Sequence, residues 1–317
     1  MNKLLFCRVV YSLCLMICFS ACLVACSGTK NGADVAPEAK HFLWKVSDDN
    51  SSVWLLGSIH LADSTLYPLA PVIDSAFAHA EELAVEINMN DDEVVKEVGE
   101  QSAAQGTLAE GTLRDLLPED MWNTVDSLCA AWNIPMEMIE KVRPWLAATT
   151  LSSYAFMQAG LNPEYGIDYV FLDRAATDGK AIVGLETAEE QISALADTTE
   201  SDSAGVYYLR TTLREISGFQ DLISNLMRAW KTGDDDLLRS LLDDGDDEDS
   251  LLQDGKYKDE YEQRIYVNRN AKMAESIAGF LREDRNVFGV VGVAHLALVK
   301  NSVIDALRKR GFKIERF

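Results

Sequence analysis

Two histidines in this chain occur in the same short pattern, in which a glycine is followed three residues later by histidine. Gly57 and His60 follow one apolar, strand-forming run, and Gly292 and His295 follow another near the C-terminus. A glycine at a strand exit lets the backbone turn sharply and lets a ligand approach closely. The sequence therefore predicts two strand ends that each present an imidazole, at the edge of the sheet where open α/β folds bind their ligands.

Two glutamates occupy comparable positions. Glu86 lies inside an apolar run that predicts a strand, and Glu186 lies where another predicted strand ends. A carboxylate in a buried strand is costly unless it is paired or binds a cation. If these strands are neighbours of the two that lead to His60 and His295, all four side chains converge at one edge of the sheet.

Two imidazoles and a glutamate are a suitable ligand set for a divalent metal. A metal held by His60, His295 and Glu86 would keep an open coordination position, where it lowers the pKa of a bound water. Glu186 could then take the proton of that water. Mixed nitrogen and oxygen ligands do not discriminate sharply between zinc, manganese and cobalt, so the predicted cofactor is one of these ions.

A structural role is the alternative for the same residues. A histidine at a strand end can simply bond a backbone carbonyl, and Glu86 can pair with Arg143 or Arg269. In a functional site, these two arginines could instead hold a substrate carboxylate or an oxyanion. The residues alone leave both interpretations open.

Other common catalytic patterns are missing from the sequence. There is no HExxH helix, no GxSxG turn, no Walker A loop and no dinucleotide-binding glycine pattern. Ser58 lies two residues before His60, but no triad accompanies it. Cys129 is the only cysteine after residue 26, and we expect it to be a small buried hydrophobe in a helix.

The elements that position these residues predict an α/β fold. Residues 41–46 and 52–56 partly alternate apolar and polar positions around a turn at 48–50, which predicts a hairpin. We expect one domain, residues 41–317, with a small mixed sheet made of the hairpin and the GxxH strands and surrounded by many helices. One of these is a long amphipathic helix over 257–282. Further strands are predicted at 83–88, 180–185, 286–291 and 313–317.

The N-terminal segment has the pattern of a targeting sequence. Residues 1–25 are expected to be a signal peptide, because positive residues precede an uncharged apolar stretch, 9–24. The stretch closes on LVAC at 23–26, a bacterial lipobox in which Cys26 becomes acylated. The polar residues 26–40 then predict a tether, although an uncleaved membrane anchor is the alternative. The expected location is the bacterial cell envelope, where the chain is lipid-anchored to a membrane.

The charge of the chain argues against one class of partner. The formal net charge is -22, and so acidic a protein repels the phosphate backbone of nucleic acid. The acidic segment 234–249 lacks the spacing of an EF-hand, so we expect a solvated loop there.

Several spaced motifs together resemble the TraB/GumN family, whose animal relatives are the TIKI metalloproteases. The resemblance extends from roughly residue 42 to residue 317. The motifs are LLGSIHLADSTLYPL at 55–69, LAVEIN at 83–88, RPW at 143–145, GIDYVFLDRA at 166–175, IVGLETAEEQ at 182–191, the WxxGD pattern at 230–234, RN at 269–270 and VVGVAHL at 290–296.

The resemblance implies both a fold and a chemistry. Paired GxxH motifs and a characteristic glutamate define the family, and here they fall on His60, His295 and Glu86. The implied α/β fold is related to the erythromycin esterases and haem-binding lipoproteins, and the animal members are divalent-metal-dependent peptidases that cleave Wnt ligands. One position departs from the pattern: Leu298 stands where the family usually has a glycine, and its side chain could narrow the backbone approach to the site.

Two functions from different classes follow from these patterns. The first is a membrane-anchored hydrolase that uses a divalent metal to cleave a peptide or a similar amide or ester substrate. The second is a non-catalytic envelope lipoprotein that binds a small-molecule ligand, or has a regulatory role, through the same pocket. Loss of activity in a folded His60→Ala variant would favour the enzyme, whereas ligand binding without turnover would favour the second function.

Overall fold

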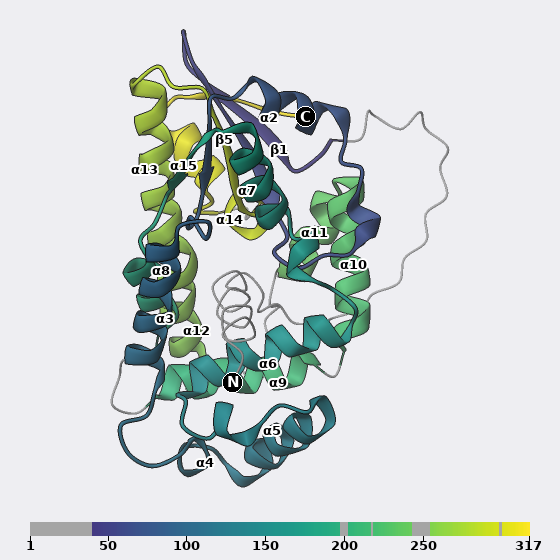
Figure 1. Cartoon of the computed structure of the whole chain (residues 1–317), viewed down its shortest axis with the longest axis vertical. Helices are drawn as coiled ribbons and strands as arrows, with labels where there is room; N and C mark the ends of the chain where they lie inside the picture. The colour runs from purple at the N-terminus through teal and green to yellow at the C-terminus, as the bar shows by residue number, and fades with distance from the viewer. Residues whose placement is uncertain (1–39, 197–201, 217, 243–253, 298–299) are drawn as a thin grey trace.

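A six-stranded mixed sheet carries both GxxH motifs (Figure 1). Its strands are β1 Leu43–Ser47, β2 Ser52–Ser58, β3 Glu82–Val85, β4 Ala181–Gly184, β5 Val287–Gly292 and β6 Lys313–Arg316. They are ordered β4-β3-β5-β2-β1-β6. β4, β3, β5 and β2 are parallel neighbours, β1 is antiparallel to β2, and β6 is antiparallel to β1. The expected α/β fold with a mixed sheet is confirmed.

The computed structural model describes residues 40–196, 202–216, 218–242, 254–297 and 300–317. The expected signal peptide, the lipidation site Cys26 and nearly all of the tether lie outside the described residues. The same holds for Leu298 and for residues 243–249 of the acidic segment. The loop expected over the rest of that segment is wrong, because Asp235–Leu242 form a helix, α11, with acidic residues in its first turn. Within the described ranges, no helix is both long enough and apolar enough to cross a membrane.

Helices form most of the remaining described chain. Figure 1 shows the sheet toward one end of the molecule and a layer of helices, α4, α5, α6 and α9, at the other end. Helices α3, α8 and α12 connect the two ends along one side, and α10 and α11 along the other. The helices are η1 Ser64–Leu66, α2 Pro71–His79, α3 Asp92–Gly106, α4 Leu113–Leu116, α5 Glu119–Trp132, η2 Met136–Met138, α6 Pro144–Gln158, η3 Pro163–Tyr165, α7 Ile167–Asp178, α8 Ala188–Leu195, α9 Ser203–Ile216, α10 Phe219–Thr232, α11 Asp235–Leu242, α12 Asp254–Glu262, η5 Gln263–Asn268, α13 Arg269–Arg282, α14 Val293–Ala297 and α15 Val303–Lys309.

The N-terminal hairpin forms as the sequence predicts. The side chain of Asp48 accepts hydrogen bonds from the backbone amides of Asn50 and Ser51, at 3.2 and 2.9 Å. An aspartate that bonds the backbone two and three residues ahead stabilises a tight turn. Cys129 is buried in α5, as expected for a small hydrophobe.

The long helix expected over 257–282 is divided into three parts. Between α12 and α13, the six residues of η5 form a π-helix, whose wider turn changes the direction of the side chains that follow. Arg269 is the first residue of α13, directly after this wide turn. The interruption therefore sets the position of an arginine that the sequence singles out.

Gly166 permits α7 to approach the loop that follows β2. A Cβ atom at this position would lie 2.1 Å from the backbone oxygen of His60, so only glycine fits. On the same side, the Ile167 amide donates to the Ile59 carbonyl at 3.1 Å. The close approach fixes the N-terminus of α7 beside the first GxxH motif.

We expect Gly166→Ala to lower the free energy of unfolding by about 1–3 kcal/mol, because the added methyl group must displace the backbone at His60. Urea unfolding followed by circular dichroism measures this change. Gly99→Ala is the matched control: nothing lies within 4 Å of its Cβ position, and alanine favours the helix by about 0.5–1 kcal/mol. Equal stability of Gly166→Ala and the native protein would contradict the steric argument.

Candidate functional site

The carboxyl ends of the four parallel strands meet at one edge of the sheet. Ser58 at the end of β2 pairs with Gly292 at the end of β5, and Val85 at the end of β3 pairs with Val290 and Gly184. The ladder between β3 and β4 continues past both ends, where the Glu186 amide donates to the Glu86 carbonyl at 3.0 Å. Because the strands are neighbours, residues from distant parts of the sequence meet at this edge.

The Arg269 guanidinium joins three of the residues that the sequence predicts for the site. Its Nη2 donates to one carboxylate oxygen each of Glu86 and Glu186, both at 2.7 Å. Its Nε donates to both oxygens of Glu186, at 2.9 and 3.1 Å. Its Nη1 lies 3.1 Å from His295 Nε2. We call Arg269, Glu86, Glu186 and His295 the Arg269 cluster.

Glu86 is ionised in this cluster. Burial alone would raise its pKa, but electrostatic interactions with His295, Arg269 and His60 and the hydrogen bond from the Gly292 amide outweigh burial and lower the pKa of Glu86 to about 2. That amide donates to Glu86 Oε1 at 2.7 Å. The glycine of the second GxxH motif thus contributes a backbone donor to the site.

Glu186 differs from Glu86 although the two carboxylates share one arginine. Burial and repulsion by Glu86 raise the pKa of Glu186, against the attraction of Arg269, and the net shift is upward. A pair of carboxyl groups whose pKa values are pushed apart can divide the roles of acid and charged group between them. Glu186 is the member that holds a proton more readily.

His295 is neutral and has a defined tautomer. It is fully buried, and burial together with the charge of Arg269 lowers its pKa to about 3. Because Arg269 can only donate, His295 Nε2 accepts its hydrogen bond. The proton therefore lies on Nδ1, which donates to Asn270 Oδ1 at 2.5 Å.

His60 has an equivalent partner on α7. Its Nδ1 lies 2.6 Å from Asp168 Oδ2, and both side chains are buried. A carboxylate at Nδ1 holds the proton on that nitrogen and leaves Nε2 as the basic atom. His60 follows the end of β2, which pairs with the end of β5, and it is close enough to interact electrostatically with Glu86 and His295.

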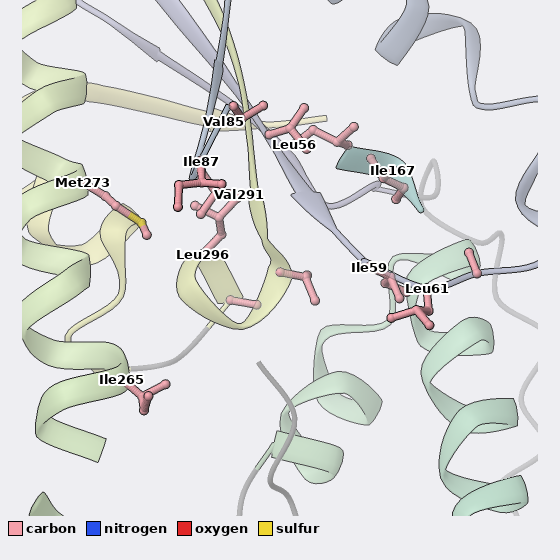
Figure 2. Close-up of a cluster of buried hydrophobic side chains, with 14 of the residues drawn as sticks. Leu56, Ile59, Leu61, Val85, Ile87, Ile167, Ile265, Met273, Val291 and Leu296 are labelled. Atoms are coloured by element: carbon pink, nitrogen blue, oxygen red, sulfur yellow. The ribbon is translucent and has the colours of Figure 1, made fainter. Parts of the chain in front are cut away.

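Buried apolar residues adjoin two of the polar residues of the site in the sequence. Figure 2 labels Ile59 and Leu61, which precede and follow His60 in the sequence, and Val85 and Ile87, which precede and follow Glu86. All four are buried. An apolar surrounding strengthens electrostatic interactions between the enclosed groups, because little water is present to screen them.

Arg143 and Ser58, two further candidates from the sequence, do not contact the Arg269 cluster through any hydrogen bond or ion pair seen in the described residues. Arg143, at the N-terminus of α6, forms its ion pair with Asp202 at 2.6 Å, so the structure does not assign it to the Arg269 cluster. Ser58 is buried, and its hydroxyl has no hydrogen-bond partner among the described residues. No base among the described residues therefore hydrogen-bonds this hydroxyl, as the activation of a serine nucleophile would require.

The expected metal ligands do not form a metal site in this arrangement. His295 Nε2 and a Glu86 oxygen face the guanidinium of Arg269, a permanent cation, rather than a common open position. Among the described residues, no three or more His, Cys, Asp or Glu side chains are placed so that they could hold a metal ion. The donor set therefore does not fit a divalent cation as the side chains are arranged.

Comparison with known proteins identifies the family. The TraB/PrgY/gumN family matches residues 42–316. The chain belongs to this family. The resemblance seen in the sequence is thus confirmed for nearly all of the described domain.

Similar proteins occur in Escherichia coli and Treponema pallidum. The chain is 25% identical over 199 residues to the uncharacterized protein YbaP of Escherichia coli strain K12. The aligned residues make up 62% of this chain and 71% of YbaP. It is 20% identical over 308 residues to an uncharacterized protein of Treponema pallidum strain Nichols, covering 96% and 91% of the two chains. No solved structure matches the chain.

For this TraB/PrgY/gumN member, the sequence gives no role to two residues that complete the site. Asp168 and Asn270 each bond the Nδ1 atom of a GxxH histidine. Both lie within motifs that carry the family resemblance, GIDY and RN. Their place in these motifs is the feature of the sequence that points to them. Their pairing with particular histidines depends on how α7 and α13 pack against the sheet.

The site predicts that acid destabilises the fold. The pKa values of His295 and Glu86 are lower in the folded protein than their ordinary values, so the unfolded chain binds more protons and stability rises with pH. The His295 contribution is complete above its ordinary pKa of 6.5 and is lost as the pH falls through about 3. The Glu86 contribution is complete above 4.5 and is lost as the pH falls through about 2. The raised pKa of Glu186 acts in the opposite sense.

We therefore expect His295→Gln to flatten the dependence of the unfolding free energy on pH between 6.5 and 4.5, the window in which the His295 contribution dominates over that of Glu86. One titrating group contributes at most about 1.4 kcal/mol per pH unit. Urea titrations at several pH values measure the slope. His79→Gln, at an exposed position of α2, is the control and should retain the native slope; an unchanged slope in His295→Gln would contradict a buried neutral imidazole.

Proposed function

We propose that this TraB/PrgY/gumN protein is a hydrolase that cleaves a peptide or a similar amide or ester bond at the edge of the sheet. The observation that carries the proposal is the buried His60–Asp168 pair, at 2.6 Å, beside a cluster of two carboxylates and an arginine. A histidine oriented by a carboxylate is a common general base.

The proposed reaction uses water as the nucleophile. His60 Nε2 takes a proton from the water, and the water oxygen attacks the carbonyl carbon of the substrate. The positive charge of Arg269 stabilises the negative charge that develops on the carbonyl oxygen. This effect is strong because little water is present in the buried site to screen it. His60 Nε2 then gives this proton to the leaving amine or alcohol as the bond between that group and the carbonyl carbon breaks.

We also propose a cellular location for the protein, and this part of the proposal rests on the sequence alone. The apolar N-terminal stretch, residues 9–24, and the lipobox cysteine, Cys26, support a chain that is lipid-anchored in the bacterial envelope. The substrate would then be a peptide or small molecule of the envelope. Metabolic labelling with a fatty acid analogue, compared between the native chain and Cys26→Ala, tests the anchor.

We expect His60→Ala to lower kcat/KM by about 10²–10⁴-fold, because it removes the general base. The measurement is turnover of a panel of fluorogenic peptides and aryl esters by the full-length protein. His79→Ala, on the exposed face of α2, is the matched control and should keep the native rate. Circular dichroism shows whether each variant is folded.

Two results would contradict the hydrolase. Activity that persists in a folded His60→Ala variant would show that another group acts as the base. Binding of a ligand in the native protein without turnover, lost in His60→Ala, would instead favour the non-catalytic envelope lipoprotein.

A further inference from the structure

Arg269 occupies the position at which the site needs a positive charge. A guanidinium has five N–H donors, and in this site each has an acceptor. Nε and Nη2 bond the carboxylates of Glu86 and Glu186, and Nη1 bonds His295 Nε2 and the carbonyl of Ile265, the latter at 3.4 Å. The side chain is 4% exposed. It is therefore held in one place by the protein itself.

The atoms that would bind a metal are the atoms that Arg269 uses. Glu86 Oε2 and Glu186 Oε2 accept from Nη2, and the accepting nitrogen of His295 faces Nη1. Glu86 Oε1 accepts from the Gly292 amide. A divalent ion among these atoms would lie against a full positive charge that cannot be removed by deprotonation.

We propose that Arg269 is the resident cation of this site and that it takes the place of the divalent metal that the family resemblance implies. It donates hydrogen bonds to both Glu86 and Glu186 and fixes the accepting nitrogen of His295. The native protein accordingly has no stoichiometric divalent-metal site at the sheet edge. The inference concerns the site of the proposed hydrolase, but it is tested by metal binding, which does not require turnover.

The test compares metal binding by the full-length protein and its Arg269 variants after treatment with EDTA and desalting. Calorimetric titration and elemental analysis with Mn²⁺, Co²⁺ and Zn²⁺ measure binding. We expect no stoichiometric binding by the native protein. Arg269→Gln should bind at least about 100-fold more tightly than the native protein, because removing the cation leaves two carboxylates and an imidazole that attract a metal.

Two further variants make the result specific. Arg269→Met removes the charge without adding an amide, and it should gain metal in the same way if it folds. Arg143→Met, which breaks the ion pair with Asp202, is the matched control and should remain without metal. Circular dichroism and thermal unfolding establish that the variants compared are folded.

Two results would overturn the inference. The first is stoichiometric binding by the native protein that is lost in His60→Ala/His295→Ala; this measurement needs no Arg269 variant to fold. The second is a folded Arg269 variant that binds no metal, since Arg269 would then not be what excludes the ion. A lack of turnover on every substrate would count against the proposed hydrolase alone.

Discussion

The structure depends on one buried arginine that compensates two buried carboxylates. Glu86 and Glu186 lie on adjacent strand ends, where two uncompensated carboxylates would repel each other strongly in an apolar interior. Arg269 reaches them from α13 and ties the ends of three strands to that helix. Removing one partner from such a buried pair typically costs about 3–5 kcal/mol, because a charge is left without compensation. The same contacts that make a site possible therefore also hold the fold together.

Much of the site could be predicted from local patterns. An apolar run that ends at a glycine predicts a strand end, and parallel neighbours bring their carboxyl ends to one edge. His60, Glu86, Glu186 and His295 are found there because each lies at or just after such an end. The alternative pairing of Glu86 with Arg269 was also available from the sequence, because a buried carboxylate must have a partner.

The partners that come from helices could not be predicted in the same way. Asp168 reaches His60 because Gly166 allows α7 to approach the backbone of that histidine. Arg269 and Asn270 are positioned by the π-helical turn of η5, which a regular helical period over 257–282 does not indicate. Both arrangements are set by packing between elements that are far apart in the sequence. The spacing of residues along the chain does not show which elements pack together. Arg269, the cation that faces Glu86 and Glu186, likewise comes from a helix, whereas the metal ligands expected from the sequence lie at strand ends.

The antiparallel direction of β1 affects how far the GxxH end of the sheet can lie from a membrane. The Gly57 amide donates to the Phe42 carbonyl at 2.8 Å, so the chain enters the sheet beside the first GxxH motif. If Cys26 carries a lipid, the segment from there to residue 40 spans at most about 50 Å. The point where the chain enters the sheet would then stay within about that distance of the bilayer, and molecules confined to two dimensions at the membrane surface would encounter this end of the sheet far more often than molecules free in bulk solution.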